Sequence, residues 1–340
     1  MSQPLSALLV ITLLAVTAAP EAQREDLQAY EPTVRVSGTI RAWGNDRMKP
    51  LMALWEAGFK RHHPAARFET SLMGTGTGIA GLYTGVADIA LMGRPADSTE
   101  TMAFEWVFRY RPLGVQVSTG SLGVPGKSFA PVVFVHKDNP ISQLTLAQLD
   151  AVFGSEHRRG QANARTWGDL GLGGSWAARP IRVYAPDIQT ATGSFFREAV
   201  LKGSYKWNCD MTEFHDVRRP DGSSHDGRQR VLDALAGEPG GIGLSALAYA
   251  GAAVKPLALS AGNEGPFYAP TPENLAARRY PLHRATWIFL NRPPGRPLDP
   301  AIREFLRYIL SRDGQRDVER AGDYLPLTAS VVRSQLGLLE

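Results

Sequence analysis

Apolar and polar positions along this chain follow two periods, one typical of helices and one typical of strands. From 48 to 62, apolar residues recur at helical spacing, and Pro64 ends the pattern. Short runs at 67–70, 87–92 and 131–135 indicate strands. Because strands alternate with helices, the pattern predicts β–α–β units and an α/β fold.

Further elements are expected before and after this region. Alternation at 34–36 predicts the strand that leads into the first loop, and Thr145 stands in the capping position of a helical pattern. The others are a strand at 181–184, helices at 146–153, 195–201, 229–236 and 302–311, and a glycine turn at 240–243.

The order of these elements predicts two lobes. Lobe I is expected to comprise 33–131 plus 252–340, because apolar runs at 254–259 and 285–290 return the chain to it. Lobe II is the inserted segment 132–251. A lobe inserted into another is the architecture of a binding protein that closes around a hinge, with its ligand between the lobes.

The N-terminal residues 1–22 have the pattern of a cleaved signal peptide. An apolar run at 5–16 precedes the small residues Ala18, Ala19 and Ala22, although no Lys or Arg stands before the run. A membrane anchor is the alternative, but the run is short for a full span. We therefore expect a periplasmic or secreted protein.

Composition narrows the class of partner. The chain has 340 residues and a net charge of +4, and removal of residues 1–22 takes away one acid, Glu21, and no base, which gives +5. A mild positive charge favours a small anion. The basic residues are scattered, so nucleic acid is not expected as a partner. Cys209 is the only cysteine, and it cannot form an internal disulfide.

Motifs for catalysis or metal binding are missing from the sequence. The seven histidines show no metal-ligand spacing, and neither a Gly-x-Ser-x-Gly elbow nor a Gly-Lys-Ser/Thr phosphate loop occurs. Residues 223–226 read Ser-Ser-His-Asp, but consecutive residues in a polar loop do not make a catalytic triad, and we interpret them as solvated. The sequence therefore predicts a binding protein without a metal or cofactor, and no enzyme.

Three loops are candidates for holding the anion. The first reads Gly-Thr-Gly-Thr-Gly at 74–78, and the others lie at 44–48 and 190–194, each ahead of a helical pattern. Glycines allow backbone N–H groups to point into one concavity, and a helix N-terminus adds the positive end of its dipole. Because loops at the carboxyl ends of strands gather in one crevice, we expect these three to form a single anion site.

Ordered motifs over nearly the whole chain resemble the PstS-like phosphate-binding proteins of ABC transporters. They lie at 44–48, 74–79, 88–95, 240–244 and 280–284, and they continue at 291–295 and 324–327. The resemblance implies a two-lobed type II periplasmic-binding-protein fold, in which each lobe is a mixed sheet flanked by helices and a cleft lies between the lobes. It also implies a monomer that captures inorganic phosphate for an ABC permease in the inner membrane.

The resemblance also implies a set of ligand-binding residues. They match the family's ligand loops and are Asn45, Asp46, Arg47, Thr75, Gly76, Thr77, Arg94, Thr190, Ala191 and Thr192. At two positions the chain departs from the family. Where many phosphate binders have an arginine before the third loop, this chain reads Ala185-Pro186-Asp187, and Gly93 stands where others have Asp or Ser.

These departures leave alternatives open. A carboxylate can select phosphate over sulfate by accepting the proton that only phosphate carries. Asp46 is a candidate for that role, and so is Asp187, although Asp46 also suits a helix cap. Arg94 is either a bidentate anion contact or the partner of a carboxylate, while Thr190 and Thr192 bind the anion or cap a helix. The alternative function is that of a related protein that binds another oxyanion, or that acts as an anion sensor or interaction module.

Overall fold

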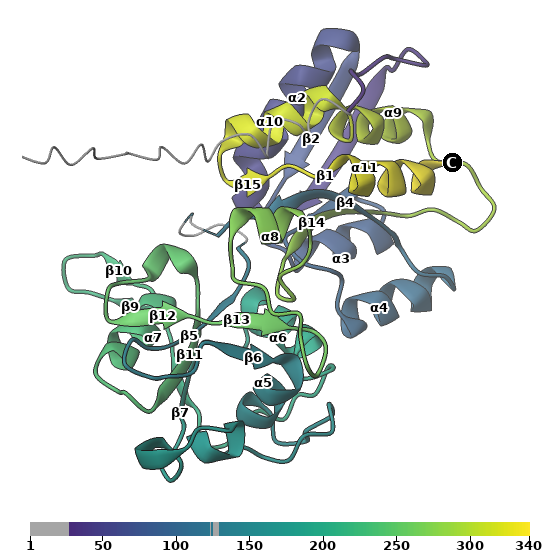
Figure 1. The fold of residues 1–340 in the computed structure, drawn as a ribbon. Coiled ribbons are helices and arrows are strands. Elements are labelled where there is room, and N and C mark those ends of the chain that lie inside the picture. The colour runs from purple at the N-terminus through teal and green to yellow at the C-terminus, as the bar shows by residue number, and fades with distance from the viewer. Residues whose placement is uncertain (1–26, 123, 125–128) are drawn as a thin grey trace, which may run out of the picture.

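In the computed structural model, which describes residues 27–122, 124 and 129–340, two mixed sheets form the centres of two lobes (Figure 1). The predicted signal peptide lies outside the described residues. The sheet of lobe I has the order β15-β4-β14-β3-β1-β2. Its strands are β1 (Gly38–Gly44), β2 (Ala66–Ser71), β3 (Ile89–Met92), β4 (Leu113–Gly120), β14 (Ala285–Leu290) and β15 (Tyr324–Leu325). β1 runs parallel to β2 and β3, whereas β14 is antiparallel to β3 and β4.

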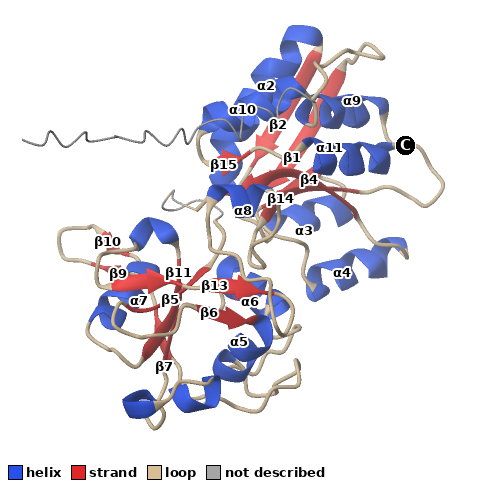
Figure 2. Ribbon diagram, in the orientation of Figure 1, coloured by secondary structure: helices blue, strands red, loops and turns tan. Residues whose placement is uncertain are grey.

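Helices cover both faces of the lobe I sheet (Figure 2). They are α2 (Lys49–His62), α3 (Thr77–Tyr83), α4 (Ser98–Phe108), α9 (Pro300–Ile309), α10 (Arg312–Ala321) and α11 (Ala329–Leu336). Successive residues of β3 point to opposite faces. Ile89 and Leu91 join the core with α2, α9 and α10, whereas Ala90 and Met92 join a smaller core with α3 and α4. This two-sided burial explains the apolar run that marked the strand in the sequence.

Lobe II is built around a five-stranded sheet in the order β12-β5-β11-β7-β8. These strands are β5 (Val132–His136), β7 (Arg182–Pro186), β8 (Thr212–Phe214), β11 (Gly241–Ser245) and β12 (Val254–Pro256). Two short ribbons are added, β6 (Gln143–Thr145) with β13 (Ala258–Ser260), and β9 (Val217–Arg218) with β10 (Ser224–His225). The helices are α5 (Leu146–Phe153), α6 (Ala191–Ala199), α7 (Gly227–Ala236) and α8 (Pro272–Ala276). Both lobes are therefore mixed sheets flanked by helices, as predicted.

The return crossing between the lobes comes later than the sequence suggested. β12 pairs with β5 and β13 pairs with β6, and Leu275, Tyr280 and Leu282 belong to the core of lobe II. The residues from 252 to about 282, which we expected in lobe I, therefore lie with lobe II. The apolar run at 254–259 suits either sheet, because its pairing partners are set by contacts distant in sequence.

Other local expectations also need correction. The strand expected at 34–36 begins instead at Gly38, and the expected turn at 240–243 contains most of β11, a strand whose residues are all buried. β4 lies in a stretch for which no strand or helix was predicted. The helix expected after Thr145 is confirmed as α5, where Thr145 and Gln148 form a reciprocal capping box.

The first described residues are fixed to lobe I by a buried polar network. The hydroxyl of Tyr30 donates to Glu304 Oε2 at 2.7 Å and lies 2.7 Å from His63 Nε2. Glu304, 1% exposed, also accepts from Arg307 Nη1 at 2.7 Å and from the hydroxyl of Thr33. Burial, followed by the bond to Glu304, raises the pKa of Tyr30 above its ordinary value, so the hydroxyl remains a donor.

Removal of this hydroxyl should destabilise the protein. In Tyr30→Phe, buried Glu304 Oε2 loses its donor at 2.7 Å and keeps only the longer bond from Thr33 N at 3.2 Å, so we expect the free energy of unfolding to fall by about 2 kcal/mol. Urea denaturation followed by circular dichroism measures the change. Tyr205→Phe is the matched control, because Tyr205 is 65% exposed and should lose almost nothing. Equal stability of the two variants would contradict the role of the network.

None of the helices in the described residues combines the length and the apolar composition that a membrane span requires.

Candidate functional site

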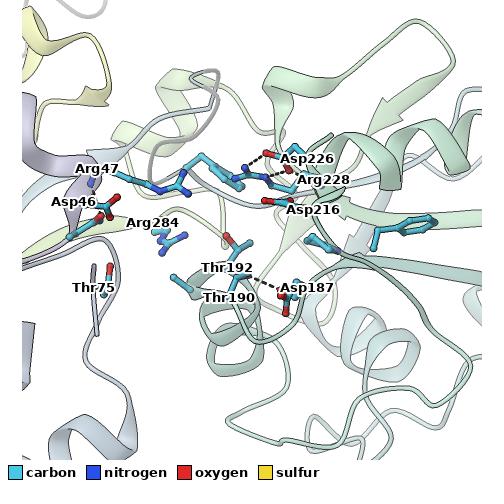
Figure 3. Close-up of a pocket in the computed structure, with 15 residues that line it drawn as sticks. Asp46, Arg47, Thr75, Asp187, Thr190, Thr192, Asp216, Asp226, Arg228 and Arg284 are labelled. Carbon is cyan, nitrogen blue, oxygen red and sulfur yellow. Dashed lines mark hydrogen bonds and ion pairs between the residues drawn. The ribbon is translucent and has the colours of Figure 1, made fainter. Parts of the chain in front are cut away.

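A cavity of about 170 Å³ lies between the two lobes, lined by polar residues from both (Figure 3). Lobe I contributes Asn45, Asp46, Arg47 and Thr75. Arg284 comes from the return crossing. The other lining residues are Phe129, Pro186, Asp187, Thr190, Ala191, Thr192, Phe214, Asp216, Asp226 and Arg228. All three loops predicted from the sequence therefore meet at one cavity.

The first loop is positioned by close contact between β1 and β3. Gly44 has a φ of +128°, and a Cβ there would lie 2.1 Å from the carbonyl oxygen of Leu91. Without that Cβ, the N–H of Asn45 donates to the same oxygen at 2.8 Å. The side chain of Asn45 then accepts from Arg47 N at 3.0 Å and caps the short helix η1 (Asp46–Met48). This arrangement places Asp46 and Arg47 at the wall of the cavity.

The Gly/Thr loop is attached to the first loop and contributes one residue to the cavity. Gly74 N donates to the carbonyl of Gly44 at 2.8 Å. Thr75 lines the cavity, but Gly76 and Thr77 are not among the lining residues. The hydroxyl of Thr77 donates to the carbonyl of Gly74 at 2.8 Å, so it holds the loop closed.

The third loop presents the N-terminus of α6 to the cavity. Thr190 caps the helix, because its hydroxyl oxygen accepts from Gly193 N at 3.3 Å and its hydroxyl donates to the carbonyl of Asp187 at 2.7 Å. The N–H groups of Ala191 and Thr192 lie in the first helical turn, where no carbonyl of the same helix can accept from them. Together with the helix dipole, these donors favour an anion at the cavity. Thr190 thus combines a cap with a place on the cavity wall, whereas Thr192 lies inside α6 and lines the cavity without capping the helix.

Arg94 lies outside the cavity lining and forms an ion pair with a carboxylate of its own chain. It is 8% exposed, and its two Nη atoms donate to the two carboxylate oxygens of Glu100 at 2.6 and 2.9 Å. Burial alone would lower the pKa of Arg94, but the bonds to Glu100 outweigh it and raise the pKa. Glu100 and Asp97 in turn form the capping box of α4. The structure therefore favours the carboxylate partner over the anion contact for Arg94.

Several cavity residues were missed in the sequence, among them the pair of Asp226 and Arg228. Arg228 Nε donates to Asp226 Oδ1 at 2.6 Å, and the hydroxyl of Tyr249 donates to Asp226 Oδ2 at 2.7 Å. Burial would raise the pKa of Asp226, but these donors outweigh it and lower the pKa. Asp226 also caps α7, so its interpretation as a solvated loop residue was wrong. Its place just before a helical pattern was the available signal.

Three side chains near the cavity are close enough to share a cation. The ligand atoms of Asp187, Glu213 and His215 lie within 4.8 Å of one another, which dispersed sequence positions did not reveal. Both carboxylates already organise the loop: Asp187 Oδ1 accepts from Gln189 N at 2.8 Å, and Glu213 Oε1 accepts from Ile188 N at 3.1 Å. These bonds give the group a structural role that needs no ion.

Comparison with known proteins places most of the chain in one family. The model of the PBP superfamily domain matches residues 29–313. The phosphate-binding protein PstS of Pseudomonas aeruginosa is 32% identical over 317 residues, which are 92% of this chain and 91% of that protein.

Solved structures share the fold at lower identity. PstS from Borrelia burgdorferi has a TM-score of 0.60 and 16% identity, covering 86% of this chain and all of that one. An ABC-type phosphate transport receptor from Vibrio cholerae has a TM-score of 0.54 and 17% identity, covering 84% of this chain and all of that one. These similarities confirm the predicted two-lobed type II fold.

Proposed function

This chain belongs to the PstS-like phosphate-binding proteins of the PBP superfamily, and from that membership we propose that it binds inorganic phosphate between its lobes for uptake by an ABC transporter. The observation that carries the proposal is the meeting of the three predicted loops at one cavity. Phosphate carries about one and a half to two negative charges at neutral pH. Backbone N–H groups, hydroxyls and arginines are the groups that compensate such a charge.

The cavity supplies each of these kinds of donor. Ala191 and Thr192 offer N–H groups of the first turn of α6, Thr75 offers a hydroxyl, and Arg47 and Arg284 offer guanidinium groups. Because these donors come from both lobes and from the crossing between them, a bound anion would draw the lobes together. This is the behaviour expected of a hinge-closing binding protein.

Asp46 is the carboxylate proposed to distinguish phosphate from sulfate. It lies on the lobe I wall of the cavity, whereas Asp226 is already paired with Arg228. A carboxylate accepts a hydrogen bond from the protonated oxygen of hydrogen phosphate. Sulfate has only acceptor oxygens, so the carboxylate would be left unpaired in the cavity, which costs on the order of several kcal/mol.

The wider role follows from the same proposal. Residues 1–22 direct export and are then cleaved; the mature protein acts in the periplasm as a monomer and delivers phosphate, chemically unchanged, to a permease in the inner membrane. It is therefore a binding protein and not an enzyme. The family's name and the predicted signal peptide support this placement.

Calorimetric titration of the mature protein with phosphate and with sulfate tests the proposal. We expect saturable heat from phosphate at micromolar to submillimolar concentration and far weaker heat from sulfate, since discrimination by an unpaired acceptor reaches about 10⁴-fold or more. If millimolar phosphate gives neither heat nor thermal stabilisation, transport of phosphate is excluded as the function. Equal affinity for the two anions would contradict the role of Asp46.

A further inference from the structure

Arg284 lies where the chain crosses from lobe II back to lobe I. The preceding Leu282 belongs to the core of lobe II, and the following residue, Ala285, begins β14 of lobe I. Arg284 is 3% exposed and lines the interlobe cavity. Figure 3 shows its guanidinium between Asp46 and Thr75 on one side and Thr190 and Thr192 on the other.

The guanidinium is held by its inner edge. Arg284 Nε donates to the carbonyl oxygen of Gly93, and the backbone carbonyl of Arg284 accepts from Gly120 N at 2.5 Å. Within residues 27–122, 124 and 129–340, no hydrogen bond joins its two Nη atoms to a protein acceptor, and no carboxylate forms an ion pair with it. The bond from Nε therefore fixes the orientation of the guanidinium, while the two Nη atoms stay available as donors to a ligand.

Two other arginines near the cavity have carboxylate partners. Buried Arg94 donates to both carboxylate oxygens of Glu100, and partly buried Arg228 is paired with Asp226. Burial, followed by the neighbouring charge of Arg94, lowers the pKa of Arg284 to about 9, and Arg47 and Arg228 add to this repulsion. The charges around Arg284 are thus mainly of its own sign.

A buried cation surrounded by cations is unfavourable unless an anion joins it. A tetrahedral oxyanion in the cavity would supply that missing charge, and its oxygens would accept from the Nη atoms. Resting on the function proposed above, we propose that Arg284 is the principal cationic ligand of the bound oxyanion and determines affinity at this site. The positive charge thus comes from the crossing segment, whereas position 186, just before the third loop, is a proline.

This assignment makes a distinction that titration can test. An arginine with a purely structural role stabilises the ligand-free protein. An arginine whose charge is compensated only by the ligand lowers the stability of the ligand-free protein, and ligand binding removes this cost. Neutral replacement of Arg284 should therefore leave the melting temperature of the phosphate-free protein unchanged or raise it by a few degrees. The same replacement should remove most of the stabilisation that phosphate gives.

The experiment compares calorimetric titration and thermal melting of four variants with the wild type, with inorganic phosphate as the probe. Arg284→Gln and Arg284→Met should bind phosphate about 100-fold more weakly. Arg284→Lys keeps the charge and should recover about tenfold of that loss. Arg278→Gln is the matched control, because Arg278 is partly buried with Nε and Nη2 unpartnered, yet it does not line the cavity. Its affinity should match the wild type.

The outcomes separate this inference from the proposed function. If the wild-type protein binds no phosphate, the proposed function itself is contradicted. If the wild type binds and either folded neutral variant of Arg284 keeps its affinity within about threefold, a difference smaller than one ordinary hydrogen bond, Arg284 is not the ligand's cation. A lower melting temperature without phosphate, combined with an unchanged rise on adding phosphate, would assign Arg284 to structure and overturn the inference as well.

Discussion

Ala191→Pro should weaken phosphate binding about 10- to 100-fold while the fold survives, because it deletes one backbone donor to a charged ligand. Ala191 is the first residue of α6, and its N–H has no acceptor within the helix. Proline is tolerated at this helical position, since the N–H that it lacks takes no part in the helix. The substitution therefore removes a ligand contact without removing a helical hydrogen bond.

Local geometry supports this substitution. A residue before proline must be extended, and Thr190 already has φ −74° and ψ 166°. Phosphate affinity is measured by calorimetric titration, and the folded state by circular dichroism and melting temperature. The hydroxyl of Thr190 remains in place to cap Gly193.

Ser98→Pro is the matched control for this change. Ser98 is exposed, stands at the first position of α4 and follows Asp97, whose backbone is also extended, with ψ 175°. It lies outside the cavity lining, so phosphate affinity should not change. If Ala191→Pro bound phosphate as tightly as Ser98→Pro, the N-terminus of α6 would not be part of the anion site.

Gly44→Ala should destabilise the protein by more than about 4 kcal/mol, which is among the largest effects of single substitutions. Two causes act together. A φ of +128° is strained for any residue with a Cβ, and the new methyl carbon would lie 2.1 Å from the carbonyl oxygen of Leu91. Relief requires β1 and β3 to separate, which would also break the bond from Asn45 N to Leu91.

Gly74→Ala separates these two causes. Gly74 has nearly the same backbone angle, φ +135°, but a Cβ there meets nothing within 4 Å. It should therefore cost only the strain of the backbone, about 1 to 3 kcal/mol. Urea denaturation gives both values, and their difference measures the collision with Leu91. Equal losses would show that β1 and β3 adjust freely at Gly44.

The local parts of the fold and site could be predicted from the sequence. The helix of 49–62, the cap at Thr145 and the loop at 190–192 are specified by spacing and capping residues within a few positions. The pattern of a helix start was enough to place Thr190 and Thr192 at the cavity, because the N-terminal turn of α6, which contains them, also forms part of the cavity wall.

Features set by distant partners could not be predicted in this way. The choice between two partners could not be made from the sequence either, because Arg94 had both a carboxylate six residues later and an anion site as candidates, and the structure pairs it with Glu100 outside the cavity lining. The strands at 254–260 join lobe II through pairing with β5 and β6, more than a hundred residues earlier. Arg284 stood inside a motif of the family, but only its burial beside other arginines separates it from a surface residue.

The place of β14 in the lobe I sheet also bears on how the chain is made. β14 lies between β3 and β4 and pairs with both, yet it follows the whole of lobe II in sequence. A nascent chain that ends before residue 285 thus holds two sheet edges with no strand between them, whereas the strands of lobe II are all present by Ser260. Lobe II can be completed first, whereas the sheet of lobe I stays open until β14 has been synthesised. On the proposal that residues 1–22 direct export, this order of synthesis would keep the larger sheet open during transport across the membrane.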